Sequence, residues 1–189
     1  MFHIAHRTIP HRDETRNGDA AFVRVSESGA KAMVAIIDGL GHGPHAAEVA
    51  DRAVEHLGGA SMDRTAMDII AGLHAVLRGT RGAAATLCVV TETALTACGV
   101  GNVALRTRGT NVPFVLSPGV LGSHIRTLRP VQCALRKGDR LVLHSDGVGS
   151  GFSLDALDHL DAEAACASIF QGFRKPTDDA TVLVLDVGG

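Results

Sequence analysis

The stretch AMVAIIDGLGHGP, residues 32–44, constrains the fold of this chain more than any other part of the sequence. A continuous apolar run stops at Asp38, and a turn with three glycines leads to Pro44, where a helical pattern begins. Proline suits the first turn of a helix because its missing N–H would have no partner there. The stretch therefore predicts a buried strand that presents Asp38 at a cleft, beside a glycine-rich turn.

The rest of the chain divides into short strand-like and helix-like segments. Apolar patterns predict strands over residues 2–7, 20–26, 31–38, 83–90, 94–100, 103–107, 140–144 and 180–187, with a less regular candidate at 125–135. Apolar residues at helical spacing predict helices over 45–57, 65–77 and 154–173, and a loop is expected over 113–122.

The connections between strands indicate how they pair. Short links at 91–93 and 101–102 favour antiparallel hairpins, because a parallel crossover needs about a dozen residues or more. Strands and helices do not alternate regularly, which argues against a doubly wound parallel sheet. The order instead favours mainly antiparallel sheets packed with helices.

Composition excludes several classes of protein. A length of 189 residues suits one compact domain. With a net charge of −2, no Trp or Tyr and 3% aromatic residues, the chain lacks the basic field and the stacking surfaces of nucleic-acid-binding proteins. No apolar run approaches the about 18 residues of a membrane span, and no signal peptide is evident. We therefore expect a cytoplasmic protein with no nucleic-acid or membrane partner.

Acidic residues recur where predicted strands begin or end. They are Asp19, Asp38, Asp146 and the pair Asp178-Asp179. An Asp-Gly pair alone is often an ordinary turn. If all these carboxylates converge, however, they repel one another unless a cation lies among them. A set of oxygen ligands suits Mg²⁺ or Mn²⁺ better than Zn²⁺, so the pattern favours a site for hard divalent ions.

Six short motifs extend this pattern over nearly the whole chain. They are N-G-D (17–19), I-I-D-G-L-G-H-G (36–43), A-A-A-T (83–86), G-V-G-N (99–102), H-S-D-G (144–147) and D-D-A-T (178–181). In this order they resemble the metal-dependent Ser/Thr protein phosphatases, the PPM family, and especially its compact bacterial SpoIIE-type and RsbX-type branch. The resemblance implies a single catalytic domain over 1–189. It also implies an α+β fold, a four-layer α-β-β-α sandwich of two mainly antiparallel sheets flanked by helices.

The same resemblance implies a site with two Mn²⁺ or Mg²⁺ ions. Asp38 matches the carboxylate that bridges both ions, and the Gly39 carbonyl matches a ligand of the second ion. Asp146 and Asp178 match ligands of the first ion, while Asp19 matches the acidic position that holds metal-bound water. Asp38 and Asp146 are the implied catalytic residues. The resemblance places Asp178, rather than its neighbour Asp179, in the ligand set because the first residue of the pair usually ligates.

The implied activity is hydrolysis of phosphoserine or phosphothreonine by metal-activated water. The implied partner is a phosphorylated regulator of the stressosome or anti-sigma-factor type. The proton donor for the leaving group stays open between His42 and His45. The phosphate-binding arginine stays open among Arg7, Arg12 and Arg16.

Two other interpretations are weaker. A catalytically inactive phosphatase fold that serves as a binding module would keep buried carboxylates that are destabilising without metal. A nucleotide-binding loop at residues 39–44 fails the G-x-G-x-x-G pattern because Pro44 occupies the third glycine position, and it lacks the Gly-Lys-Ser/Thr ending of a P-loop.

Overall fold

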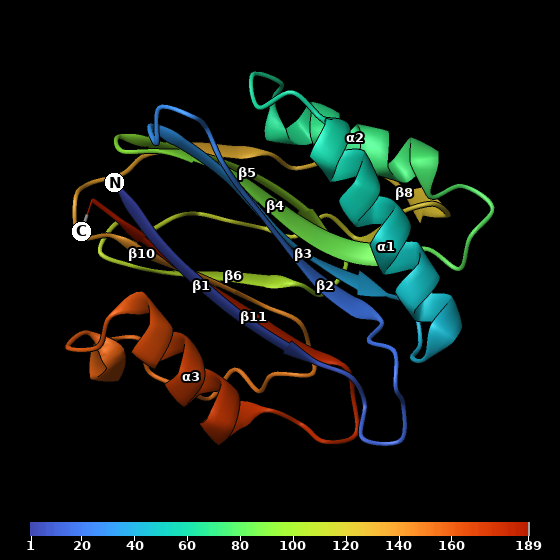
Figure 1. Cartoon of the computed structure of the whole chain (residues 1–189). Coiled ribbons are helices and arrows are strands. Elements are labelled where there is room, and N and C mark those ends of the chain that lie inside the picture. Colours follow the sequence, from blue (N-terminus) through green and yellow to red (C-terminus); the bar gives the residue numbers. More distant parts are fainter. Residues whose placement is uncertain (189) are drawn as a thin grey trace.

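The computed structural model describes residues 1–188 as two antiparallel sheets that face each other between outer helices (Figure 1). The first sheet has the order β2 (Asp19–Val25), β3 (Lys31–Gly39), β4 (Ala83–Thr91), β5 (Ala94–Val100) and β9 (Val131–Ala134). The second has the order β1 (Phe2–Ile9), β11 (Ala180–Val187), β10 (Arg140–His144) and β6 (Ala104–Arg108). The predicted α+β sandwich is confirmed.

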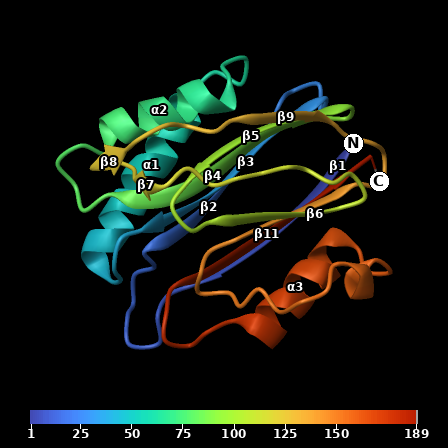
Figure 2. The same cartoon turned by 180° about the vertical axis from the view of Figure 1, so that it is seen from behind.

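Helices cover both outer faces of the sandwich (Figure 2). Helices α1 (Pro44–Gly59) and α2 (Ala66–Val76) pack on the first sheet, and α3 (Ala162–Phe173) packs on the second. A short 3-10 turn η1 (Asp155–Leu157) precedes α3, and a small hairpin joins β7 (Gly119–Val120) to β8 (His124–Ile125). Among residues 1–188, no helix combines the length and apolar character needed to cross a membrane.

Strand β3 is apolar at every position over residues 32–37 because both of its faces are covered. Met33, Ala35 and Ile37 lie in the apolar layer beneath α1 and α2. Val34 and Ile36, which point the other way, lie in the layer between the two sheets. Because successive strand residues face opposite sides, a strand covered on both faces needs apolar residues at every position. The polar Asp38 marks the point where this strand leaves the core.

The predicted hairpin across residues 101–102 is wrong. Strand β5 pairs with β4 and β9, whereas β6 pairs with β10 in the opposite sheet. The link at Gly101-Asn102 therefore crosses from one sheet to the other. Thr86 holds this crossing, since its Oγ1 donates a 2.6 Å hydrogen bond to the Val103 carbonyl. A short connection reverses the chain direction but does not determine which strand becomes the hydrogen-bonded neighbour.

Two other segments differ from the sequence-based expectation. The predicted helix over 154–173 divides into the 3-10 turn η1 and the α-helix α3, which begins at Ala162 because Asp161 caps it by accepting a 2.8 Å hydrogen bond from the Ala164 N–H. The predicted strand over 125–135 divides into β8 and β9 around Pro130, which has no N–H to donate to a sheet. The expected loop over 113–122 contains the short strand β7.

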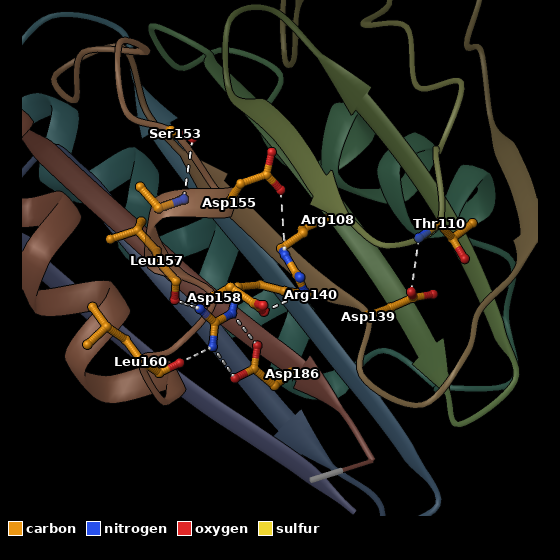
Figure 3. Close-up of polar contacts among 11 residues, drawn as sticks. Arg108, Thr110, Asp139, Arg140, Ser153, Asp155, Leu157, Asp158, Leu160 and Asp186 are labelled. Atoms are coloured by element: carbon orange, nitrogen blue, oxygen red, sulfur yellow. Dashed lines mark hydrogen bonds and ion pairs between the residues drawn. The ribbon is translucent and has the colours of Figure 1, made fainter.

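A buried arginine fastens the segment before α3 to the second sheet (Figure 3). Arg140 on β10 lies opposite Asp186 on β11, and its Nε and Nη2 atoms donate to the two carboxylate oxygens at 2.5 and 2.7 Å. Its Nη1 and Nη2 atoms also donate to the carbonyls of Leu157 and Leu160 at 2.8 and 2.7 Å. A guanidinium is tolerated in a buried position when it is paired with a carboxylate and hydrogen-bonded in this way. Arg140 therefore anchors the segment of Leu157 and Leu160 to the second sheet.

Candidate metal centre

Carboxylates from both sheets meet at one end of the sandwich. Asp38 comes from the end of β3, Asp146 follows β10, and Asp178 precedes β11. All three line one cavity of ≈ 260 Å³, together with Leu40, Gly41, His42, Ala84 and Asn102. Segments more than a hundred residues apart thus contribute acidic groups to one place.

Asp19 does not line this cavity. Its side chain is buried, and its Oδ2 accepts a 2.6 Å hydrogen bond from the Ser145 hydroxyl. The Ser145 oxygen in turn accepts a 3.0 Å bond from the Thr181 N–H. These bonds join β2 of the first sheet to β10 and β11 of the second, so they fix the two sheets relative to each other beside the acidic cavity.

Glycines allow the acidic segments to approach one another. A Cβ atom on Gly147 would collide with the backbone carbonyl of Asp179. A Cβ atom on Gly18 would lie 2.6 Å from the Asp179 carboxylate, and one on Gly39 would lie 2.5 Å from the Ala46 carbonyl. Gly18, Gly39 and Gly147 therefore lie where neighbouring segments leave no room for a Cβ atom.

The glycine-rich turn after β3 needs a second property of glycine. Gly41 and Gly43 have φ angles of +85° and +75°, in the left-handed region that other residues rarely adopt. The Gly39 N–H donates a 2.9 Å bond to the Gly18 carbonyl, and the Leu40 N–H donates a 3.0 Å bond to the Gly82 carbonyl. The turn is thus held on both sides by neighbouring segments.

Burial and mutual repulsion make the acidic groups unusually weak acids. Burial, opposed by hydrogen bonds and reinforced by neighbouring carboxylates, raises the pKa of Asp19 to about 7. Burial together with the neighbouring carboxylates raises the pKa of Asp38 to about 8. The pKa of Asp178 is also raised, again chiefly by burial. Ionising this set near neutral pH therefore calls for positive charge nearby.

The protein supplies little of that charge. Within residues 1–188, no Lys, Arg or His side chain forms an ion pair with Asp19, Asp38, Asp146 or Asp178. Lys175 lies close, but its Nζ donates to the backbone carbonyl of Asp146 at 2.5 Å. An uncompensated cluster of oxygen ligands fits a hard divalent cation such as Mg²⁺ or Mn²⁺.

Within residues 1–188, the acidic side chains do not form a closed group of three metal ligands. Two of them are held by different partners: Asp19 accepts a hydrogen bond from Ser145, and Asp146 accepts one from Asn102, whose Nδ2 lies 2.6 Å from Oδ2. This separation is what repulsion between like charges favours. A carboxylate reorients by side-chain rotation alone, so Asp38, Asp146 and Asp178, which line one cavity, can turn their oxygens toward a shared ion.

The two members of the Asp178-Asp179 pair have different surroundings. Asp178 is half-buried and lines the cavity, and its Oδ1 accepts a 2.9 Å bond from the Asp179 N–H. Asp179 is buried, and its Oδ1 accepts a 2.8 Å bond from the His11 N–H, while its Oδ2 has no partner. This geometry favours Asp178 as the ligand and gives Asp179 a role in holding the N-terminal loop.

The two candidate histidines, His42 and His45, also have different surroundings. His42 lines the cavity, its Nδ1 lies 2.8 Å from the Glu14 carboxylate, and its ring stacks on His11 with 4.8 Å between centroids. His45 does not line this cavity, and its Nδ1 lies 3.8 Å from the Glu48 carboxylate. Of the two, only His42 lines the cavity.

The candidate arginines Arg7, Arg12 and Arg16 do not line the cavity. Their acidic partners are Glu163, Asp13 and Asp51, at N···O distances of 2.6, 3.4 and 2.7 Å. Sequence reasoning missed Arg81, whose guanidinium lies beside the glycine-rich turn. It also assigned no role to Asn102, although this residue ends the G-V-G-N motif, or to Ser145, which directly precedes Asp146.

Comparisons with known proteins agree with this architecture. The family model described as Stage II sporulation protein E (SpoIIE) matches residues 28–188. No curated protein matches the chain. A solved structure described as "The bacterial stressosome: a modular system that has been adapted to control secondary messenger signaling" is 31% identical, with a TM-score of 0.89, and the match covers 98% of this chain and 99% of the other.

Two further solved structures share the fold at lower identity. RsbX in complex with magnesium is 19% identical, with a TM-score of 0.86 and coverage of 99% of this chain and 96% of the other. The catalytic domain of the serine/threonine protein phosphatase PstP, in complex with two manganese ions, is 16% identical, with a TM-score of 0.75 and coverage of 100% and 99%.

Proposed function

This chain belongs to the SpoIIE family of PPM-type phosphatase domains, and on that basis we propose that it is a metal-dependent serine/threonine protein phosphatase. The observation that carries the proposal is the meeting of Asp38, Asp146 and Asp178 at one cavity, with no ion-pair partner within residues 1–188. The magnesium in RsbX and the two manganese ions in PstP support hard divalent ions as the cofactor.

We assign the metal ligands residue by residue. Asp38, the Gly39 carbonyl, Asp146 and Asp178 would hold two Mn²⁺ or Mg²⁺ ions, with Asp38 as the ligand common to both. Asp19, which is buried and does not line the cavity, would act through metal-bound water. Two such ions lower the pKa of water, orient the phosphate and stabilise the charge that develops on it.

The chain's own side chains position this set. The Asn102 amide holds the Asp146 carboxylate, and the Ser145 hydroxyl holds that of Asp19. Hydrogen bonds of this kind orient metal ligands and restrict their motion. The departing serine or threonine oxygen needs a proton, and we assign this role to His42 because it lines the cavity and contacts Glu14.

The proposed substrate is a phosphoserine or phosphothreonine of a bacterial signalling regulator. The similar structure at 31% identity is described in the context of the bacterial stressosome, and RsbX shares the fold over almost the full length. These likenesses support a regulator of the stressosome or anti-sigma-factor type as the partner. We further propose that the whole chain, 1–189, acts as one catalytic domain in the cytoplasm.

The test is hydrolysis of p-nitrophenyl phosphate while Mn²⁺ or Mg²⁺ is titrated. We expect turnover that depends on metal and that falls at least about 100-fold in Asp38→Asn, with an unchanged circular dichroism spectrum. Asp155→Asn is the matched control, because Asp155 is exposed and does not line the metal cavity. Wild-type protein without turnover at any metal concentration contradicts the proposal and favours an inactive phosphatase fold that serves as a binding module.

A further inference from the structure

A second groove with basic side chains opens beside the metal cavity. Its volume is ≈ 300 Å³, and its walls come from the first half of α1 and from the loop between α2 and β4. Its polar lining residues are His45, Glu48, Arg52, Thr80 and Arg81. We refer to it as the arginine groove, after Arg52 and Arg81.

The arginine groove adjoins the metal cavity where Arg81 lies next to Gly41. The Arg81 Nη1 atom lies 3.2 Å from where a Cβ atom on Gly41 would be, and Gly41 itself lines the metal cavity. The next residue, Gly82, accepts the hydrogen bond from the Leu40 N–H. The Thr80 hydroxyl donates to the Leu77 carbonyl at 2.7 Å, which fixes the start of the loop. Arg81 is therefore held at the boundary between the two hollows.

The guanidinium groups of Arg52 and Arg81 are available to bind an anionic ligand. Both are exposed, and within residues 1–188 neither forms an ion pair or a side-chain hydrogen bond. Arg16, by contrast, is already paired with Asp51 on α1. The one acidic side chain that lines the groove, Glu48, lies 3.8 Å from His45. The groove thus has a positive balance directly beside a strongly acidic cavity.

This arrangement matters for a protein substrate. A guanidinium binds a carboxylate through a planar pair of hydrogen bonds, which a lysine or a neutral side chain cannot reproduce. A peptide that placed its phosphate in the metal cavity and ran over Gly41 would bring a neighbouring residue to Arg81. An acidic residue there gains attraction to the arginine groove, whereas an apolar or neutral residue gains none.

We propose that Arg81 and Arg52 form a specificity subsite for an Asp or Glu side chain that flanks the phosphorylated serine or threonine. The proposal rests on the phosphatase function proposed above and names a substrate class for it: phosphoproteins with an acidic residue close to the phosphorylated one. The subsite selects among substrates and takes no part in the chemical step.

The test uses two phosphothreonine peptides that differ only in Glu or Gln at the flanking positions. Wild-type protein, Arg81→Gln, Arg52→Gln and the double variant are compared by kcat and KM for both peptides. Arg136→Gln is the matched control, since Arg136 is an equally exposed arginine in the turn after β9, beside a different cavity that Glu92 lines. It removes the same charge far from the metal cavity.

We expect wild-type protein to have a lower KM for the Glu peptide than for the Gln peptide, with similar kcat for both. Each arginine substitution lowers that preference about twofold to fivefold, the range expected of an exposed ion pair. The preference also falls as salt is raised, because salt screens exposed charges. Arg136→Gln leaves the preference unchanged.

Three results overturn the subsite. Equal losses on both peptides mean that Arg81 contacts the shared phosphate, no loss means that the groove is not used, and an equal loss in Arg136→Gln means a general charge effect. A binding experiment separates the subsite from the phosphatase function. Fluorescently labelled forms of the two peptides are bound to Asp38→Asn, and their fluorescence anisotropy is measured. A Glu preference that Arg81→Gln removes supports the subsite even if wild-type protein shows no turnover.

Discussion

Asp19 and Asp38 lie directly opposite each other on the neighbouring strands β2 and β3. Like charges at such positions repel, and here both carboxyl groups are also withdrawn from water. Burial accordingly raises the pKa of Asp19 to about 7 and the pKa of Asp38 to about 8. The strand register therefore holds two acids that keep protons near neutral pH unless another positive charge replaces them.

Without divalent ions, the free energy of unfolding should fall as pH rises from about 6.5 to 8. The folded pKa values lie above the ordinary value of 3.8, so the folded state binds more protons than the unfolded state in this window, and stability declines with pH. Urea unfolding in EDTA at several pH values measures the slope, which Asp38→Asn should reduce. Stability that is constant or increases over this window contradicts the prediction.

The window begins at about 6.5 because His144 acts in the opposite sense below it. Burial lowers the pKa of this histidine below its ordinary value of 6.5. The unfolded state then binds the extra proton, so stability is lost as pH falls through that region.

Stabilisation by Mn²⁺ should be larger at pH 8 than at pH 6, because metal and protons compete for the same carboxylates. At a concentration of 100 times Kd, binding adds about 2.7 kcal/mol. A domain of this size gains about 2–4 °C in Tm per kcal/mol, so we expect a rise of about 5–10 °C at pH 8. Differential scanning fluorimetry measures the rise, and Asp38→Asn should remove most of it. An equal rise in that variant would place the metal elsewhere.

Substitution of the two neighbouring aspartates should have different consequences. Asp178→Ala should weaken Mn²⁺ binding strongly with little change in stability, because the side chain is half-buried and faces the cavity. Asp179→Ala should cost about 1–3 kcal/mol, because the half-buried His11 N–H loses its acceptor. Calorimetric Mn²⁺ titration and urea unfolding separate the effects. Reversed results would make Asp179 the ligand.

Asn102→Ala should lower Mn²⁺ affinity or kcat/KM about 10-fold to 100-fold, the usual effect of losing a group that orients a metal ligand. The Asn102 amide is the hydrogen-bond donor to the Asp146 carboxylate. Asn111→Ala provides a control, since Asn111 lines a different cavity, beside β6. Activity equal to wild type in Asn102→Ala would exclude the orienting role.

Gly147→Ala should destabilise the fold by about 3 kcal/mol, because its Cβ would collide with the Asp179 backbone and force the two acidic segments apart. The control is Gly149→Ala, whose nearest contact, the Phe173 carbonyl, lies at an ordinary 3.5 Å. Urea unfolding measures both. Equal stability of the two variants would mean that the backbone relaxes without cost.

The sequence by itself determined the local elements and the chemistry of the site. Residues 32–37 are apolar at every position, which required a strand covered on both faces, and the observed β3 is such a strand. The three glycines after Asp38 indicated a turn, and Gly41 and Gly43 have the positive φ angles that such a turn uses. Such features depend on neighbouring residues in the chain, so periodicity and turn chemistry reveal them.

Only the tertiary structure decided which segments meet. The link at Gly101-Asn102 crosses between sheets because Ala104–Arg108 pairs with β10, a choice that depends on long-range packing. The same packing turns Asp178 into the cavity and Asp179 toward the His11 N–H. It also brings Arg81 beside Gly41. No short-range pattern encodes these contacts, because they arise from residues far apart in the chain that bury their surfaces together.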